Sequence, residues 1–275
     1  GAVDLGPTTL GTNLTVTNTG IGAITDSGTL TVPLQTRITA GAGNDIPPDS
    51  VANDFNSIQI ISGNNVTLVD TDELNFGAYF SGSGYPSDIS GDLDVTAGGD
   101  ITQQQYAWVD GFSAITVDGA ATFTASNASA PINLYLGPTD PFSGATGQSN
   151  TFTGEVTLAR TNTNTGFTNV QLRNTSANAS VLTGLTSVGD LNNVFLRYDN
   201  APAVELPGMT LTGSLKVFAP SVANTASTPT NLISQTGPIS VAADTMIRAA
   251  TTGGIDLSAN RREATWAAAI HTDPA

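Results

Sequence analysis

The chain of 275 residues carries a formal net charge of −15 with 8 Lys and Arg residues, and charged residues make up only 11% of it. Nucleic acids and anionic membrane surfaces attract clustered Lys and Arg, so this composition excludes both as expected partners. The chain has no Cys, which excludes disulfide frameworks, thiolate metal sites and cysteine nucleophiles.

Hydrophobic residues make up 39% of the chain, which is too many for a disordered chain and predicts a folded one. No stretch approaches the roughly 18 apolar residues of a transmembrane helix, so we expect a protein that is not inserted in a membrane. Residues 1–4 lack the basic and apolar regions of a signal peptide. Either a signal peptide has been removed or the sequence is an interior piece of a longer chain, and we expect the second because the first residues already fit the middle of a repeat.

Short stretches in which two apolar residues flank a polar one recur along the chain, separated by Gly, Asn, Asp or Ser. This period-two alternation predicts strands that are buried on one side. Strands of three residues are too short for a conventional sandwich but fit the sides of a solenoid coil. In chain order, the clearest stretches are residues 14–16, 30–32, 58–60, 66–68, 93–95, 115–117, 156–158, 170–172, 194–196, 215–217 and 239–241.

A larger repeat is built from these stretches. Three copies of an x-Leu-x-Val unit begin at Asn13, Asp92 and Ser214, at intervals of 79 and 122 residues. A constant set of strands with loops of variable length is typical of solenoids. We attribute the longer interval to inserts at residues 137–149 and 174–190.

The repeats predict the dimensions of the solenoid. A coil of about 20 residues implies about 13 coils and a rod of roughly 60 Å. Gly63, Gly98 and Gly99 are expected at corners that need a positive φ. Phe55 and Phe152, together with Phe123, are expected to stack inside the coils.

The repeats predict two segments. Residues 1–260 are expected to form the β-solenoid, and residues 261–275 an atypical C-terminal tail. In the tail, Trp266 and Ile270 have a helical spacing. Two readings stay open, a cap over the last coil or a linker to a neighbouring module.

Several strings of the chain resemble the repeats of filamentous-haemagglutinin-like proteins, which are exported by two-partner secretion. They are DLDVTAGGDITQ at 92–103, TFTGEVTLAR at 151–160, ITAGAGNDI at 38–46, NDFNSIQI at 53–60 and NNVTLVD at 64–70. The resemblance implies an all-β fold, a right-handed parallel β-helix (β-solenoid) with loop inserts. It also implies an extracellular or cell-surface location and a role in adhesion, biofilm or fibre formation.

Two groups of carboxylates could in principle support glycosidase or lyase chemistry on a β-helix. They are Asp70, Asp72 and Glu73, and Asp88, Asp92 and Asp94. Enzymes of this architecture also need basic residues in the groove, whereas the basic residues here are scattered along the chain and Lys216 is the one lysine. Asp94 and Lys216 are predicted to occupy the same outward position in related repeats. We therefore expect no enzymatic activity.

Metal and cofactor sites are not expected. The one histidine, His271, lies in the tail, which leaves no His-based zinc cluster or Ser-His-Asp triad. Residues 41–46 are close to half of a calcium-binding nonapeptide, but that chemistry needs tandem copies and none is adjacent. Weak calcium binding by Asp45, Asp49 and Asp54 stays open.

The sequence thus predicts a non-catalytic structural segment of a secreted bacterial surface or fibre protein. The expected partners are copies that associate end to end or the continuation of a longer chain, with host or matrix glycans as further candidates. The alternative is a carbohydrate-binding or carbohydrate-cleaving β-helix protein. Its candidate ligand-facing aromatic residues are Tyr79, Tyr85, Tyr106 and Trp108.

Overall fold

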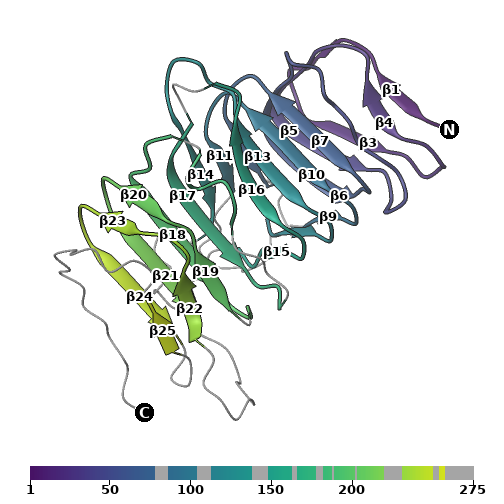
Figure 1. Ribbon diagram of the computed structural model, residues 1–275. Helices are drawn as coiled ribbons and strands as arrows, with labels where there is room; N and C mark the ends of the chain where they lie inside the picture. Colours follow the sequence, from purple (N-terminus) through teal and green to yellow (C-terminus); the bar gives the residue numbers. More distant parts are fainter. Residues whose placement is uncertain are drawn as a thin grey trace.

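A computed structural model describes most of the chain as a stack of strands with β1 (Val3–Leu5) near one end and β25 (Gly254–Asp256) near the other (Figure 1). The described residues are 1–77, 86–103, 113–137, 148–162, 166–177, 182–187, 189–201, 203–219, 231–249 and 254–257. They contain strands, isolated bridges and turns and no helix, hence none with the length and apolarity that crossing a bilayer requires.

Every strand pair in the described residues is parallel. The chain therefore returns to the same side once per coil, and the strands of each side form a ladder along the stack. We name the three sides faces A, B and C in the order in which the chain visits them. This is the parallel β-helix that the sequence predicts, and the all-β fold is confirmed.

Face B is the longest ladder and contributes one strand to each coil. In the first coils its strands are long enough to run on into face C, so β3 (Leu14–Thr17) pairs with the second half of β5. In order along the stack, the strands of face B are β2 (Thr8–Thr9), β5 (Leu30–Thr39), β6 (Asp54–Ser62), β8 (Leu74–Phe76), β11 (Ile101–Gln103), β14 (Ile132–Leu136), β17 (Phe167–Asn174), β18 (Asn193–Tyr198), β21 (Leu215–Ala219) and β24 (Thr245–Ala249).

Faces A and C are ladders with interruptions. Bridges at Ile46 and Thr183 continue face A where no full strand forms. Face A consists of β1, β4 (Ile24–Asp26), β7 (Val66–Asp70), β10 (Leu93–Ala97), β13 (Ala121–Ala125), β16 (Val156–Arg160), β20 (Met209–Leu211) and β23 (Ile239–Val241). Face C consists of β9 (Ser87–Ile89), β12 (Ile115–Val117), β15 (Thr151–Phe152), β19 (Val204–Leu206), β22 (Asn231–Gln235) and β25.

The coils are longer and fewer than the sequence predicts. Partners on neighbouring coils are 18 residues apart at Ser57 and Asn75 but 36 apart at Leu134 and Val170. The ten strands on the path of face B mark ten coils in the described residues, which at about 4.8 Å per strand span roughly 43 Å. The prediction of about 13 coils of about 20 residues is therefore wrong, because the loops add length without adding coils.

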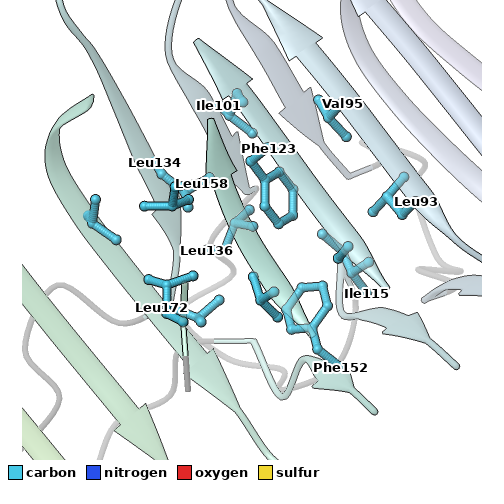
Figure 2. Close-up of a cluster of buried hydrophobic side chains, with 14 of the residues drawn as sticks. Leu93, Val95, Ile101, Ile115, Phe123, Leu134, Leu136, Phe152, Leu158 and Leu172 are labelled. Atoms are coloured by element: carbon cyan, nitrogen blue, oxygen red, sulfur yellow. The ribbon is translucent and has the colours of Figure 1, made fainter. Parts of the chain in front are cut away.

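The core is a column of apolar side chains enclosed by the three faces (Figure 2). The five-residue strands β7, β10 and β13 alternate buried and partly or fully exposed residues. Phe55, Phe123 and Phe152 are fully buried as predicted, and the rings of Phe123 and Phe152 meet edge to face with centroids 6.1 Å apart.

The prediction that the corner glycines are needed for a positive φ is wrong. Gly63, Gly98 and Gly99 are not among the glycines with a positive φ, which in the described part of the chain are Gly22, Gly41, Gly77, Gly184 and Gly189. A Cβ on Gly98 would lie 2.1 Å from the carbonyl oxygen of Thr71 on the preceding coil. The corner needs glycine because neighbouring coils approach closely there, and the backbone conformation does not demand it.

Amide side chains connect the coils at the corner between faces A and B. Asn133 donates from its backbone N and from Nδ2 to Asp100, and Nδ2 of Asn169 donates to Oδ1 of Asn133 at 2.7 Å. The backbone N and Nδ2 of Asn193 donate in turn to Oδ1 of Asn169, and the backbone N of Ser214 donates to Oδ1 of Asn193. This ladder spans five coils and explains why Asn recurs at the start of successive strands of face B, since each Asn both donates and accepts.

The large repeat predicted from the sequence is wrong, because it aligns residues that lie on different faces of the solenoid. The three Leu residues that were aligned lie on different faces, with Leu14 on a strand beside the second half of β5, Leu93 on face A and Leu215 on face B. All three nevertheless point toward the core, as expected. The proposed insert at residues 174–190 is in part core as well, because Leu182 and Leu185 are buried.

Candidate functional site

The first predicted carboxylate group lies at the corner after β7, but its members do not share a site. Asp72 and Glu73 are exposed, whereas Asp70 is 2% exposed. Its Oδ2 accepts a hydrogen bond from the backbone N of Phe55 at 2.8 Å, and its Oδ1 accepts one from the backbone N of Asp72 at 3.0 Å. The carboxyl of Asp70 therefore fastens two segments of backbone and is not presented to a substrate.

The environment of Asp70 also changes its titration. Burial raises the pKa of its carboxyl from 3.8 to about 7, although the two backbone N–H groups lower the pKa, and the negative charge of Asp72 adds to the increase. Near pH 7 this carboxyl is partly protonated in the folded protein, whereas in the unfolded chain it is ionised.

We expect Asp70 to make the fold less stable as pH rises from 5 to 8. In this range the folded state holds a proton that the unfolded state has released, so the free energy of unfolding falls with rising pH. The difference spans about two pH units between pH 5 and the pKa of about 7, so at 1.36 kcal/mol per unit the loss is about 3 kcal/mol. Urea unfolding of the wild type and Asp70→Asn at pH 5, 6.5 and 8 measures it. In Asp70→Asn the free energy of unfolding should no longer fall by this amount between pH 5 and pH 8. Asp94→Asn, at an exposed site, should show the same fall as the wild type. Equal slopes in all three proteins would contradict the assignment.

The second predicted carboxylate group is spread over two faces. Asp88 lies on β9 of face C, Asp94 on β10 of face A, and Asp92 at the corner between them. Oδ1 of Asp92 accepts a hydrogen bond from the backbone N of Ala120 at 2.8 Å, which connects it to the next coil. All three side chains are exposed, so this corner is an acidic surface.

The residues considered for calcium are not gathered around one point. Oδ1 of Asp45 accepts hydrogen bonds from Asn64 and Asn65 of the next coil, at 2.9 Å from Nδ2 of Asn64. The backbone N of Asp49 instead donates to Asp26, and Asp54 lies on β6. Within the described ranges, no three His, Cys, Asp or Glu side chains come close enough to hold a metal ion.

The other sequence candidates fall outside the described residues. These are Tyr79, Tyr85, Tyr106, Trp108, His271 and the tail 261–275.

A cleft of about 460 Å³ lies where face A is interrupted between β16 and β20. Its lining includes Leu185, Leu191, Met209 and Pro238, and the one charged residue of the lining is Asp190. A single carboxylate does not supply the acid and base pair that glycoside hydrolysis uses.

The most distinctive surface was missed by the sequence reasoning. Residues on neighbouring strands of face B form two outward rows along the stack, set by the register of the strands. One row is Thr102, Tyr135, Gln171, Phe195, Lys216 and Met246, and the other is Arg173, Arg197, Phe218 and Arg248. We call the part of these rows on β17, β18, β21 and β24 the basic face, and these four strands are neighbours in the stack (Figure 1). Four of the chain's eight basic residues lie on it.

Two expectations are corrected by the basic face. The basic residues are not all scattered, because Lys216 lies on a row, between Phe195 and Met246, that runs beside the row of the three arginines. Nor do Asp94 and Lys216 occupy equivalent positions, because Asp94 lies on face A and Lys216 on face B. The alternation in each strand predicts that these side chains point outward, but only the register brings them together.

Aromatic rings and one carboxylate hold the cations of the basic face in place. Nζ of Lys216 lies 5.0 Å from the centre of the Phe195 ring, and the guanidinium groups of Arg197 and Arg248 lie 5.3 and 5.4 Å from the centre of the Phe218 ring. These distances are within the range of cation–π attraction. Nε of Arg197 also lies 2.6 Å from Oδ1 of Asp199.

Arg173 is held by the same carboxylate. Its Nε lies 2.8 Å from Oδ2 of Asp199, so one acid is shared by two arginines from neighbouring coils. Arg173 is itself buried, at 9% exposure, and the side chain of Arg197 is 15% exposed. The basic face therefore presents its positive charge mainly through the half-buried Lys216 and Arg248, on a chain whose net charge is −15.

Comparison with known proteins identifies the family but no activity. No curated protein and no solved structure matches the chain. One family model, described as "Repeats of unknown function (DUF5649)", matches three successive segments, residues 1–62, 63–188 and 191–262. These segments span nearly the whole chain and agree with an architecture of stacked coils. The chain therefore belongs to this family of repeats of unknown function.

Proposed function

We propose that the chain is a rod-forming structural segment of a secreted bacterial surface or fibre protein, and that it is not an enzyme. The observation that carries the proposal is the uninterrupted ladder of face B, ten strands in the described residues. A parallel stack of this kind supplies length and rigidity, because each coil forms hydrogen bonds with the coil before and the coil after.

The outward side chains are mostly uncharged but polar, which suits a structural rod that is surrounded by water. On face A, the outward positions of β7, β13 and β16 are Thr67, Thr122 and Thr157. Oγ1 of Thr157 lies 3.0 Å from Oγ1 of Thr183 on the next coil. Hydroxyl and amide groups thus provide the hydration that charged residues provide in most soluble proteins.

The absence of catalysis is proposed from the state of the two carboxylate groups. The carboxyl of Asp70 is buried and accepts hydrogen bonds from two backbone N–H groups. The carboxylate of Asp92 accepts a hydrogen bond from the backbone N of the next coil at the corner. An adhesive role, export by two-partner secretion and binding of glycans are the finer parts of the proposal and rest on the resemblance of the repeats to filamentous-haemagglutinin-like proteins. End-to-end contact between copies would pair the open strand edges of the terminal coils.

The location and the role can be tested on cells of the source organism. Antibodies against the purified chain should label intact cells, and electron microscopy should place the label on surface fibres. Label that appears only after the cells are made permeable would contradict the proposal.

Enzymatic activity is tested separately. The purified chain should release no reducing ends from any polysaccharide of a broad panel, and Asp92→Asn should behave in the same way. Reproducible cleavage by the wild type would favour the carbohydrate-active alternative, and a glycan array tests binding without cleavage.

A further inference from the structure

The acidic residues and the basic face lie in different parts of the stack. From residue 38 to residue 159 the sequence has no Lys or Arg and 14 Asp and Glu residues. The basic face lies on β17, β18, β21 and β24, which form the last four coils of face B in the described residues. The rod therefore has an acidic first part and a cationic surface near its other end.

The acids of the first part include an exposed row along the corner between faces C and A, with Asp88 on the strand before the corner and Asp94 on the strand after it. The row begins beside Ile46 and ends beside β16, so it runs along the third to seventh coils. We call it the acidic edge. Its members, all exposed, are Asp45, Asp88, Asp92, Asp94, Asp118 and Glu155.

The composition of the basic face is that of a protein interface. Arg, aromatic residues and Met are enriched where proteins meet, and this face combines three arginines with Phe195, Phe218 and Met246. The side chain of Met246 is 43% exposed and is one of the few large hydrophobic residues on the described surface. Elsewhere the outward positions are mostly Thr, Asn and Asp.

The fixed cations also argue for a protein partner over a sugar. A sugar ring stacks on an open aromatic face, whereas Lys216 covers Phe195, and Arg197 and Arg248 lie over Phe218. What the surface offers is a set of preorganised positive charges beside an apolar Met. Its complement is a line of carboxylates along a rigid edge.

We propose that the basic face binds the acidic edge of a second copy of this chain, so that rods lie side by side with a shift along their axis. The cations lie on successive coils about 4.8 Å apart, whereas Asp45, Asp92 and Glu155 directly precede Ile46, Leu93 and Val156 and so recur on every second coil. Carboxylates of one rod can therefore face cations of the next along several coils. Different surfaces of the two copies take part, and such a contact extends from copy to copy unless the rotation between copies closes a ring. The inference goes beyond the rod function proposed above and stands whether or not the protein is an adhesin.

Sedimentation velocity of the whole chain tests the contact. At about 20 mM NaCl the wild type should associate with rising concentration, and about 500 mM NaCl should return it to monomers because salt screens the charges. A single monomeric species at every concentration in low salt would overturn the proposal.

Charge reversal on each side locates the contact. Lys216→Glu/Arg248→Glu should weaken association at least about tenfold, since like charges then face each other. Arg37→Glu/Arg160→Glu is the matched control, with the same change of net charge away from the basic face, and should stay within about threefold of wild type. Equal weakening by both pairs would overturn the assignment to this face. Circular dichroism should be the same for all proteins.

Mixing two variants provides the decisive test. Asp94→Lys/Asp118→Lys should also associate more weakly alone, because two lysines then stand among the four remaining carboxylates of the acidic edge. Mixed with Lys216→Glu/Arg248→Glu, it should associate, since each variant retains one surface that fits its partner. A mixture that stays monomeric would overturn the proposal. The proposal would also be overturned if the wild-type chain bound polygalacturonate through Lys216 and Arg248 but did not associate with itself.

Discussion

Replacing Asn150 with alanine is expected to lower the free energy of unfolding by about 4 kcal/mol. Asn150 is fully buried. Its Oδ1 accepts hydrogen bonds from the backbone N of Ile115 at 2.9 Å and from Nε2 of Gln103 at 2.6 Å. Its Nδ2 donates to the carbonyl oxygen of Leu136 at 2.9 Å and to Oε1 of Gln103 at 3.0 Å. Alanine leaves four buried polar groups without this partner, and each such loss costs about 1–3 kcal/mol before neighbours rearrange.

Equilibrium urea unfolding measures the effect of Asn150→Ala. The matched control is Asn56→Ala, because Asn56 makes a similar bond, from Nδ2 to the carbonyl oxygen of Pro33 at 2.9 Å, at an exposed site. Surface changes of this kind stay within about 0.5 kcal/mol. A loss below about 1 kcal/mol for Asn150→Ala would show that Gln103 and water replace the amide.

Replacing Phe152 with alanine is expected to cost about 3–5 kcal/mol and to divide the unfolding of the rod into two steps. The ring of Phe152 is fully buried and meets Phe123 edge to face, so its removal leaves a cavity as well as losing burial. Each coil of a solenoid contacts only its neighbours, and a weak coil in the middle therefore uncouples the two ends.

Calorimetry and hydrogen exchange would show this division. The wild type should unfold in one transition, whereas Phe152→Ala should show two, with exchange protection lost first on the strands around β15. Val51→Ala is the control, because Val51 is 81% exposed. A single transition in Phe152→Ala, lowered as a whole, would mean that the cooperative unit is longer than a few coils.

Local patterns in the sequence determined the strands and their buried sides. In β10, Leu93 and Val95 are at most 1% exposed while Asp94 is exposed, because successive side chains of a strand point to opposite sides. The same reasoning places Phe55 and Phe123 inside. Short alternating strands cannot bury their apolar sides alone, so the stacked architecture also follows from the sequence.

The sequence did not determine the phase of the coils. A unit such as Leu-x-Val fits any side, and it occurs beside β5, on face A and on face B. The distance between register partners varies because loops leave the stack without disturbing it. A repeat read from spacing alone therefore aligned residues that belong to different faces.

Only the tertiary structure decided which outward side chains are neighbours. Arg173 and Lys216 are 43 residues apart, yet they lie on strands separated by β18 alone. Alternation acts within one strand and is visible in the sequence, whereas lateral neighbours depend on the length of every intervening loop. The scattered basic residues of the sequence thus become the basic face of the folded rod, since parallel stacking brings each strand beside the one a coil away.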